Sequence, residues 1–203
     1  MLYLRRFSLP GQGAEASFLA RDSENKRTCY GSRYPFGIFL SRKVPPLTFE
    51  PITILCGGNG CGKTTVGKAL AEKLGRPLAD VDEKIIEEVG CSIPHIFATE
   101  GEEGFRVREH RALAQIAKES GQVISAGGGI VTRTENRDRM EENSVVVWLR
   151  RDLDKLPTDG RPVSQSVPRE ELYRRRAPLY EAMAQVTVDN NGTVEDTVDE
   201  IIK

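Results

Sequence analysis

Eight residues in the second quarter of the chain have the spacing needed to hold nucleotide phosphates. The run Gly57-Gly58-Asn59-Gly60-Cys61-Gly62-Lys63-Thr64 fits the P-loop pattern G-x-x-x-x-G-K-[ST]. Glycines let successive backbone N–H groups curl around phosphate oxygens, and the start of a helix adds its dipole. The lysine of such a loop reaches the outer phosphates, and the threonine hydroxyl binds Mg²⁺. We expect nucleotide contacts from Gly60, Cys61, Gly62, Lys63, Thr64 and Thr65.

The residues on either side of this loop favour a nucleotide site. The run Ile52-Thr53-Ile54-Leu55-Cys56 is apolar and typical of a buried strand. Residues 65–74 have apolar side chains at helical spacing and are followed by Gly75 and Pro77. A glycine-rich turn that matches by chance is the alternative, and the strand and helix make it much the weaker one.

Acidic residues and glycines follow two later strands. Asp80 and Asp82 close a predicted strand over 77–82, and a spacing of two places both on one face. One could hold the water shell of Mg²⁺ while the other faces a substrate hydroxyl, and solvated strand-end acids are the alternative. Gly127-Gly128-Gly129 follow a predicted strand over 122–125. They suggest a backbone pressed against a small ligand, with a flexible turn as the alternative.

Arginines at three separate places could bind anionic groups. Arg106 falls on a helix face near the predicted pocket, and Arg161 stands in a polar segment rich in proline and glycine. Arg176 precedes an Ala-Pro pair that we expect to interrupt a helix and so direct it inward. Paired guanidinium groups hold a carboxylate in one orientation, and a loop arginine can close over a transferring phosphate. We assign Arg174 and Arg175 to a solvated helix face.

The elements that position these residues alternate strand and helix from Pro51 onward, which predicts a parallel sheet with crossover helices. The carboxyl ends of such strands share one edge, where ligands bind. Thr99, with Glu102 three residues later, is the expected N-cap of the longest helix. We expect strands at 52–56, 77–82, 122–125, 145–149 and 186–188, and helices at 65–74, 83–89, 93–97, 99–120, 135–141, 170–183 and 193–203.

Residues 1–50 differ from the remainder because short β-leaning runs alternate with turn-rich stretches. We expect a small antiparallel β-rich appendage there, followed by an α/β domain over 51–203. Hydrophobic residues make up 38% of the 203-residue chain and charged residues 29%, as in a soluble globular protein. The net charge of −1 argues against nucleic-acid or membrane partners, and the apolar runs are too short to span a bilayer.

The cysteines and the first ten residues bear on the compartment. The chain has four cysteines without C-x-x-C spacing and only two histidines, so we expect no zinc site. A disulfide at Cys61 would compete with nucleotide binding, which indicates a reducing cytosol with unpaired thiols. Residues 1–10 lack the apolar core of a signal peptide.

Six motifs in order resemble those of the shikimate kinase family: GGNGCGKTT, DVD, SIPHIFATEGEEGFRVRE, SAGGG, GRP and RRRAPLY. The resemblance covers residues 52–203. It implies ATP-dependent phosphorylation of the 3-hydroxyl of shikimate, with Mg²⁺, in aromatic amino-acid synthesis. It also implies a P-loop fold of nucleoside-monophosphate-kinase type, with a five-stranded parallel sheet of order 2-3-1-4-5 and a lid. We expect a cytoplasmic monomer whose partner is a small molecule.

The resemblance implies roles for residues that match the family motifs. Thr64 and Asp80 match the family's Mg²⁺-binding residues, and Asp80 is expected to bind the ion through a water molecule. Arg161 matches the lid arginine that closes over ATP. Lys63, Asp82 and Arg161 are the expected catalytic residues. The expected shikimate contacts are Asp82, Arg106, Gly128 and Arg176, with Gly127 and Gly129 beside them.

Two departures from the family pattern leave alternatives open. The lid region 156–161 is shorter than in many members, and the arginine that often lies against adenine is not evident, so Asn190 and Asn191 are candidates for that contact. Residues 30–55 resemble the leading β-layer of ABC-like ATPases, which a fusion, a chimera or a misplaced start would explain. The competing functions are a gluconate- or nucleotide-type kinase, an ABC-like ATPase module and a nucleotide-binding pseudoenzyme. The ABC signature helix and its Asp-Glu strand end are missing from the sequence.

Overall fold

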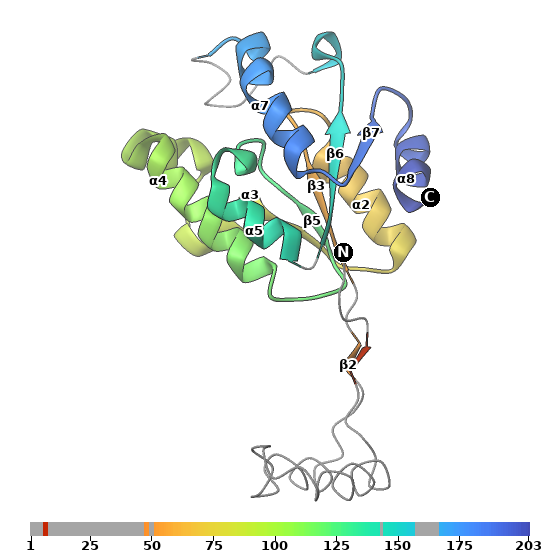
Figure 1. Ribbon diagram of the computed structural model, residues 1–203. Helices are drawn as coiled ribbons and strands as arrows, with labels where there is room; N and C mark the ends of the chain where they lie inside the picture. Colours follow the sequence, from red (N-terminus) through yellow and green to blue (C-terminus); the bar gives the residue numbers. More distant parts are fainter. Residues whose placement is uncertain (1–5, 8–46, 49–50, 143, 157–166) are drawn as a thin grey trace, which may run out of the picture. The chain divides into compact units, whose positions relative to one another are not determined.

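Five parallel strands form a single sheet in the larger part of the protein (Figure 1). The structure is a computed structural model that describes residues 6–7, 47–48, 51–142, 144–156 and 167–203. The sheet order is β4-β5-β3-β6-β7, and every neighbouring pair is parallel. This is the predicted order 2-3-1-4-5, which is confirmed. The strands are β3 (Ile52–Cys56), β4 (Leu78–Asp80), β5 (Val123–Ser125), β6 (Ser144–Arg150) and β7 (Val186–Asp189).

Alternating side chains of the central strands build two separate hydrophobic cores. In β3, Ile54 packs in one core and Leu55 in the other, as a period of two requires. The core on the Leu55 side is closed by α2 (Lys63–Leu74) and α8 (Val194–Ile202). The core on the Ile54 side is closed by α3 (Val81–Val89), α4 (Ile93–Ile116), α5 (Thr134–Glu142) and α7 (Arg169–Met183). Because both faces are covered, the strands are almost continuously apolar.

The chain divides into two units, Tyr3–Phe49 and a larger unit that contains Glu50–Lys203. In the smaller unit, β1 (Arg6–Phe7) pairs antiparallel with β2 (Leu47–Thr48), with Arg6 opposite Thr48. The other β-leaning runs predicted before residue 47, and most of the ABC-like resemblance, lie outside the described residues.

Two details of the helices differ from prediction. Thr99 is not an N-cap: α4 starts after Ser92, and the Thr99 hydroxyl donates to the carbonyl of His95. The break expected before the long helix lies instead at Gly101, whose φ of 72° and ψ of −173° only glycine adopts readily. The second error concerns Pro178, which does not interrupt α7. Tyr180 and Met183 are buried in the core, and their packing holds the last turn in place.

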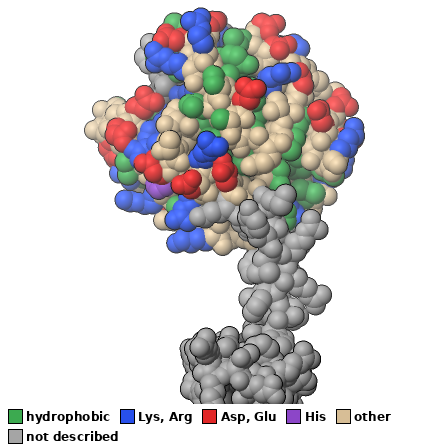
Figure 2. Space-filling view, viewed as in Figure 1, with side chains coloured by type: hydrophobic (Ala, Val, Ile, Leu, Met, Phe, Trp, Pro, Cys, Tyr) green, Lys and Arg blue, Asp and Glu red, His purple; other side chains and the backbone are tan. Residues whose placement is uncertain are grey.

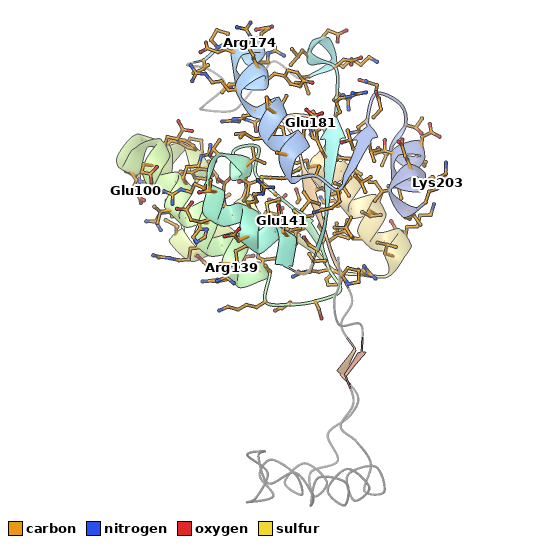
Figure 3. All side chains as sticks on the ribbon, in the orientation of Figure 1. Glu100, Arg139, Glu141, Arg174, Glu181 and Lys203 are labelled. Carbon is orange, nitrogen blue, oxygen red and sulfur yellow. The ribbon has the colours of Figure 1, made fainter. Side chains whose placement is uncertain are left out.

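Basic and acidic side chains are interspersed over the visible face of the larger unit, as Figure 2 shows. Arg174 and Arg175 are exposed, as predicted, and Figure 3 shows Arg174 in the upper part of α7. Among the described helices, none combines the length and apolar character that a bilayer crossing needs.

Candidate active site

The phosphate loop closes around the ammonium group of its own lysine. Lys63 is the first residue of α2, and its Nζ donates to the carbonyls of Gly57 at 2.9 Å and Gly58 at 3.1 Å. The side chain is buried, so these carbonyls replace water around the charge. Gly60 and Gly62 have φ values of 81° and 93°, which allow the loop to curl. The result is a cup of backbone with a positive charge inside it.

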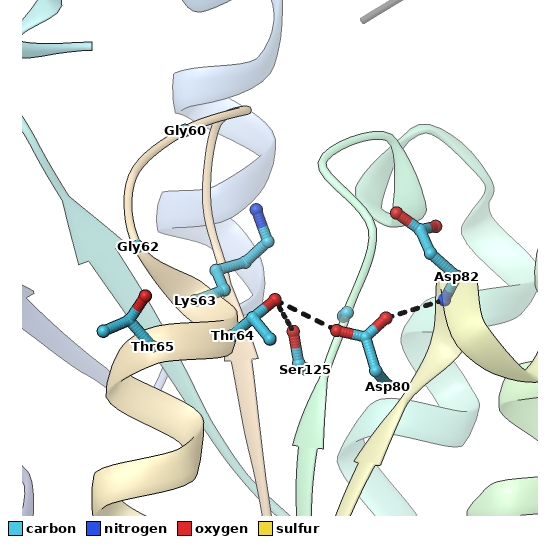
Figure 4. Close-up of a pocket in the computed structure, with 9 residues that line it drawn as sticks. Gly60, Gly62, Lys63, Thr64, Thr65, Asp80, Asp82 and Ser125 are labelled. Atoms are coloured by element: carbon cyan, nitrogen blue, oxygen red, sulfur yellow. Dashed lines mark hydrogen bonds between the residues drawn. The ribbon is translucent and has the colours of Figure 1, made fainter. Parts of the chain in front are cut away.

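A cavity of about 220 Å³ adjoins this cup. Figure 4 shows Lys63 and Thr64 on one side of it, facing Asp80 and Asp82 across the gap. Thr65 also lines the cavity, whereas the Cys61 side chain is buried in the core beneath the loop. The phosphate contacts predicted within the loop, other than Cys61, therefore meet at one cavity, whose lining is Gly60, Gly62, Lys63, Thr64, Thr65, Asp80, Asp82, Ser125 and Ala126.

Oxygen atoms gather at the carboxyl ends of β4 and β5. The Thr64 hydroxyl donates to Oδ2 of Asp80 at 3.0 Å, and Oγ of Ser125 lies 3.4 Å from Thr64 Oγ1. Hydroxyl and carboxylate oxygens are ligands that Mg²⁺ prefers, with water and phosphate completing the shell. Within the described residues, no group of three or more His, Cys, Asp or Glu could bind a metal without such help.

The prediction that Asp80 and Asp82 share one strand is wrong. Strand β4 ends at Asp80, and Asp82 lies in the first turn of α3. Oδ1 of Asp80 accepts from the N–H groups of Asp82 at 2.9 Å and Glu83 at 3.4 Å, so Asp80 is the N-cap of that helix. This cap starts the helix as soon as the strand ends. Both aspartates nevertheless reach the same cavity.

A second cavity of about 280 Å³ shares Asp82 with the first. It combines a cationic side with an apolar side. Arg106 and Arg176 supply the guanidinium groups, and Phe97 and Phe105 stack with ring centroids 4.6 Å apart. The full lining is Asn59, Asp82, Ile86, Ile93, Pro94, Phe97, Phe105, Arg106, Glu109, Gly127, Gly128, Gly129 and Arg176. All predicted substrate contacts therefore lie around one cavity next to the phosphate cup.

Arg106 belongs to a buried ion pair that sequence reasoning missed. Its Nη1 donates to Oε2 of Glu109 at 2.6 Å, and its Nη2 lies 3.3 Å from Oε1 of Glu102. Glu109 is 0% exposed, and burial raises the pKa of its carboxyl group although the charge of Arg106 opposes the shift. Burial acts to lower the pKa of Arg106, but the two carboxylates outweigh it and the pKa is raised. The i,i+3 spacing of Arg106 and Glu109 was the available signal.

The three glycines after β5 leave room for side chains from other elements. A Cβ on Gly127 would overlap Oε1 of Glu109, and a Cβ on Gly129 would overlap the guanidinium group of Arg106. A Cβ on Gly128 would overlap the side chain of Asn59 in the phosphate loop. The tight approach proposed from the sequence is therefore present, but here it is to neighbouring side chains of the protein.

Helix α7 holds the carbonyl of Gly128. Nη1 of Arg176 donates to it at 3.2 Å, and the hydroxyl of Tyr180 donates to it at 2.5 Å. Arg176 is buried and faces the cavity, although α7 is not interrupted at Pro178 as predicted. The side chain points inward because its helix face packs on the sheet.

The predicted lid and adenine contacts lie outside the two cavities or outside the described residues. Arg161, the predicted lid arginine, lies outside the described residues. Asn190 was a candidate for adenine contact, but its amide Nδ2 donates to the carbonyl of Cys61 and its Oδ1 accepts from Thr197. Asn191 accepts from the N–H group of Asp152.

Of the described cysteines, Cys56, Cys61 and Cys91 are free thiols, and burial raises the pKa of Cys56 to about 12.

Comparison with known proteins shows which family the sequence matches. A family model described as shikimate kinase matches residues 59–203. Shikimate kinase of Stenotrophomonas maltophilia (strain K279a) is 41% identical over 150 residues, which cover 70% of this chain and 83% of the relative. The chain belongs to the shikimate kinase family. Shikimate kinase of Acinetobacter baumannii (strain AYE) is 37% identical over 172 residues, which cover 79% of this chain and 96% of the relative.

Solved structures of the shikimate kinase family agree with the fold. Shikimate kinase from Acinetobacter baumannii in complex with shikimate superposes with a TM-score of 0.63 at 34% identity, over 75% of this chain and 91% of that one. Shikimate kinase from Bacteroides thetaiotaomicron superposes with a TM-score of 0.67 at 29% identity, over 74% and 96%. The predicted family and its reaction class, ATP-dependent phosphorylation of shikimate, are confirmed. The competing gluconate, nucleotide and ABC-like functions are not favoured.

Proposed function

We propose that this shikimate kinase uses MgATP and that the residues around its two adjoining cavities divide the reaction between them. The observation that carries the proposal is the position of Asp82, which lines both the phosphate cavity and the cavity with the two arginines. A substrate hydroxyl held at Asp82 would stand next to the nucleotide phosphates. Positioning of this kind contributes about 7 kcal/mol or more to catalysis in well-oriented systems.

The cationic cavity suits a small hydroxy-acid. Arg106 and Arg176 are both less than 10% exposed, with values of 5% and 7%, so a carboxylate bound between them would be shielded from water. The ion pair with Glu109 holds Arg106 in place, and the contact with Gly128 holds Arg176. The apolar faces of Phe97 and Phe105 would pack against the carbon ring of shikimate.

Asp82 is assigned to the 3-hydroxyl of the substrate. Its carboxylate would accept the hydrogen bond of that hydroxyl and orient the oxygen for attack, or accept its proton. Helix α3 presents this side chain, because Asp80 caps the helix at the residue where β4 ends. Asp80 therefore helps to position Asp82 and also belongs to the proposed Mg²⁺ site.

On the nucleotide side, the loop N–H groups and Lys63 would neutralise phosphate charge. Lys63 enters the cup already fixed by the carbonyls of Gly57 and Gly58. Thr64, Asp80 and Ser125 form a set of oxygen donors that fits Mg²⁺. When bound, Mg²⁺ offsets the negative charge of the β- and γ-phosphates. Arg161 is proposed as the lid arginine from its motif alone.

A coupled assay of ADP release tests the proposal. The full-length protein is incubated with MgATP alone, then with shikimate, gluconate or a nucleoside monophosphate. We expect ADP release to depend on shikimate and a single phosphorylated product at the 3-position, identified by NMR. ADP release that is independent of shikimate, or is driven by gluconate instead, would refute the substrate assignment.

A further inference from the structure

A buried amide lies behind the phosphate loop. Asn190 follows β7 and is 3% exposed. Its Nδ2 donates to the carbonyl oxygen of Cys61 at 2.5 Å, across 129 residues of chain. The Asn190 N–H group donates to the carbonyl of Arg150 at 2.7 Å, which fixes the residue to the end of β6. One residue therefore ties the loop to the ends of β6 and β7.

The bond to Cys61 also sets the direction of the next N–H group. In a trans peptide the C=O and N–H groups point in opposite directions within one plane. Because the Cys61 carbonyl points to Asn190, the N–H group of Gly62 points away from it. Gly62 lines the phosphate cavity, whereas Asn190 does not. Asn190 therefore directs the Gly62 N–H group toward the space where phosphate oxygens bind.

A hydroxyl group on α8 fixes which way the Asn190 amide faces. The Cys61 carbonyl can only accept, so the amide nitrogen must lie against it. Oδ1 is then left for Thr197, whose Oγ1 donates to it at 2.7 Å. Thr197 is 1% exposed and belongs to α8. Both ends of the amide are thus bonded within the protein, and the orientation is not set by solvent.

The glycine of the loop is matched to this amide. A Cβ at Gly62 would lie 2.9 Å from Nδ2 of Asn190, closer than real Cβ contacts. The residue also has a φ of 93°, which residues with a side chain rarely adopt. Gly62 is therefore required both by the turn and by the approach of Asn190.

We propose that Asn190, oriented by Thr197, is a positioning residue that preorganises the phosphate loop for ATP and ADP. Only one part of the proposed function is needed for this role, namely that the loop binds nucleotide phosphates. Asn190 then acts through the backbone of Cys61 and Gly62 and does not touch the nucleotide. Its loss weakens nucleotide binding and leaves the shikimate cavity, formed by other elements, as it was.

Calorimetric titration of the full-length protein with ADP tests this role, together with KM values for both substrates. We expect Asn190→Ala to raise the ADP dissociation constant about fivefold to thirtyfold, with the shikimate KM within about twofold of wild type. Asn190→Asp should weaken ADP binding more, because a carboxylate cannot donate to Cys61 and adds negative charge behind the loop. The near-isosteric Thr197→Val should raise the dissociation constant about twofold to fivefold.

Thr193→Ala is the matched control. Thr193 caps α8 through its bond with the N–H group of Asp196, so its loss loosens the same helix without removing the contact to Cys61. We expect this variant to have a lower Tm and an unchanged affinity for ADP. Equal loss of ADP affinity in Thr193→Ala and Asn190→Ala would overturn the proposal. So would wild-type affinity in Thr197→Val, which also decides the case if Asn190→Ala does not fold. Wild-type protein that binds ADP but does not act on shikimate would instead refute the proposed reaction.

Discussion

Oε2 of Glu109 lies 2.6 Å from Nη1 of Arg106, one helical turn away on α4 and in the wall of the proposed substrate cavity. Among the described residues, the second carboxylate oxygen of Glu109 has no hydrogen-bond partner, and neither has Nε of Arg106. Each partner of this buried pair therefore has one polar atom still able to form a hydrogen bond. A buried ion pair of this kind is costly to break, since the remaining charge has no water to solvate it.

Replacement of Glu109 by Gln should weaken shikimate binding in a pH-dependent way. Burial raises the pKa of Glu109, and a carboxyl group with a raised pKa takes up its proton at a higher pH than an exposed Glu. As the pH falls through that pKa, Arg106 loses the anion that holds it. We expect the wild-type KM for shikimate to rise over this range, and Glu109→Gln to have a KM raised by about tenfold at neutral pH.

KM measurements from about pH 8 to about pH 5 check this prediction. The carboxylate of shikimate takes up its own proton in both proteins, so that contribution cancels in the ratio of the two KM values. The ratio should fall toward one as the pH decreases. A ratio that stays constant with pH would show that Glu109 does not titrate against Arg106 in this range.

Gly129→Ala should act on the same guanidinium group. The added methyl group would overlap Arg106, which cannot swing aside without leaving Glu109. We expect a KM for shikimate raised by about tenfold or more, with the KM for ATP unchanged, because about 1.4 kcal/mol of lost binding gives a factor of ten. Gly192→Ala is the control, since its methyl group would meet Asp196 at an ordinary 3.6 Å. Equal effects on both KM values would point to general misfolding instead.

Lys63→Ala should reduce kcat strongly while the helix content of the protein stays near that of wild type. The ammonium group supplies charge that is needed most as the phosphoryl group transfers, and loss of one such group costs about 10²–10³ in kcat. Lys68→Ala, at an exposed position on the same helix, serves as the control for helix content. Turnover by Lys63→Ala within about tenfold of wild type would contradict the assigned role.

Asp82→Asn should lower kcat by about 10²–10⁴ and leave the KM for ATP nearly unchanged. An amide retains the size of the side chain and loses the ability to accept a proton. Glu83→Gln tests the neighbouring exposed acid in the first turn of α3 and should have no effect. A kcat of Asp82→Asn within about tenfold of wild type would contradict the assigned role.

The phosphate loop could be predicted from sequence because its chemistry is local. A strand, a glycine-rich turn and a helix follow one another within 52–74, so the spacing alone brings Lys63 and Thr64 together. Sheet order and family also followed from motifs in chain order. The error at Asp80 and Asp82 arose because a strand and a helix start share the same residues, and only the cap bond of Asp80 decides where one ends.

The sequence by itself determined the family and its reaction class, and it predicted the groups involved: a nucleotide loop, acids for a hydroxyl and arginines for a carboxylate. Only the tertiary structure decided which side chains fix these groups in position. Glu109 lies against Arg106 because α4 is buried at that turn, and Asn190 reaches Cys61 because β6 and β7 end side by side under the loop. The contact between Asn190 and Cys61 is set by packing between segments 129 residues apart, and such packing leaves no spacing pattern in a single chain.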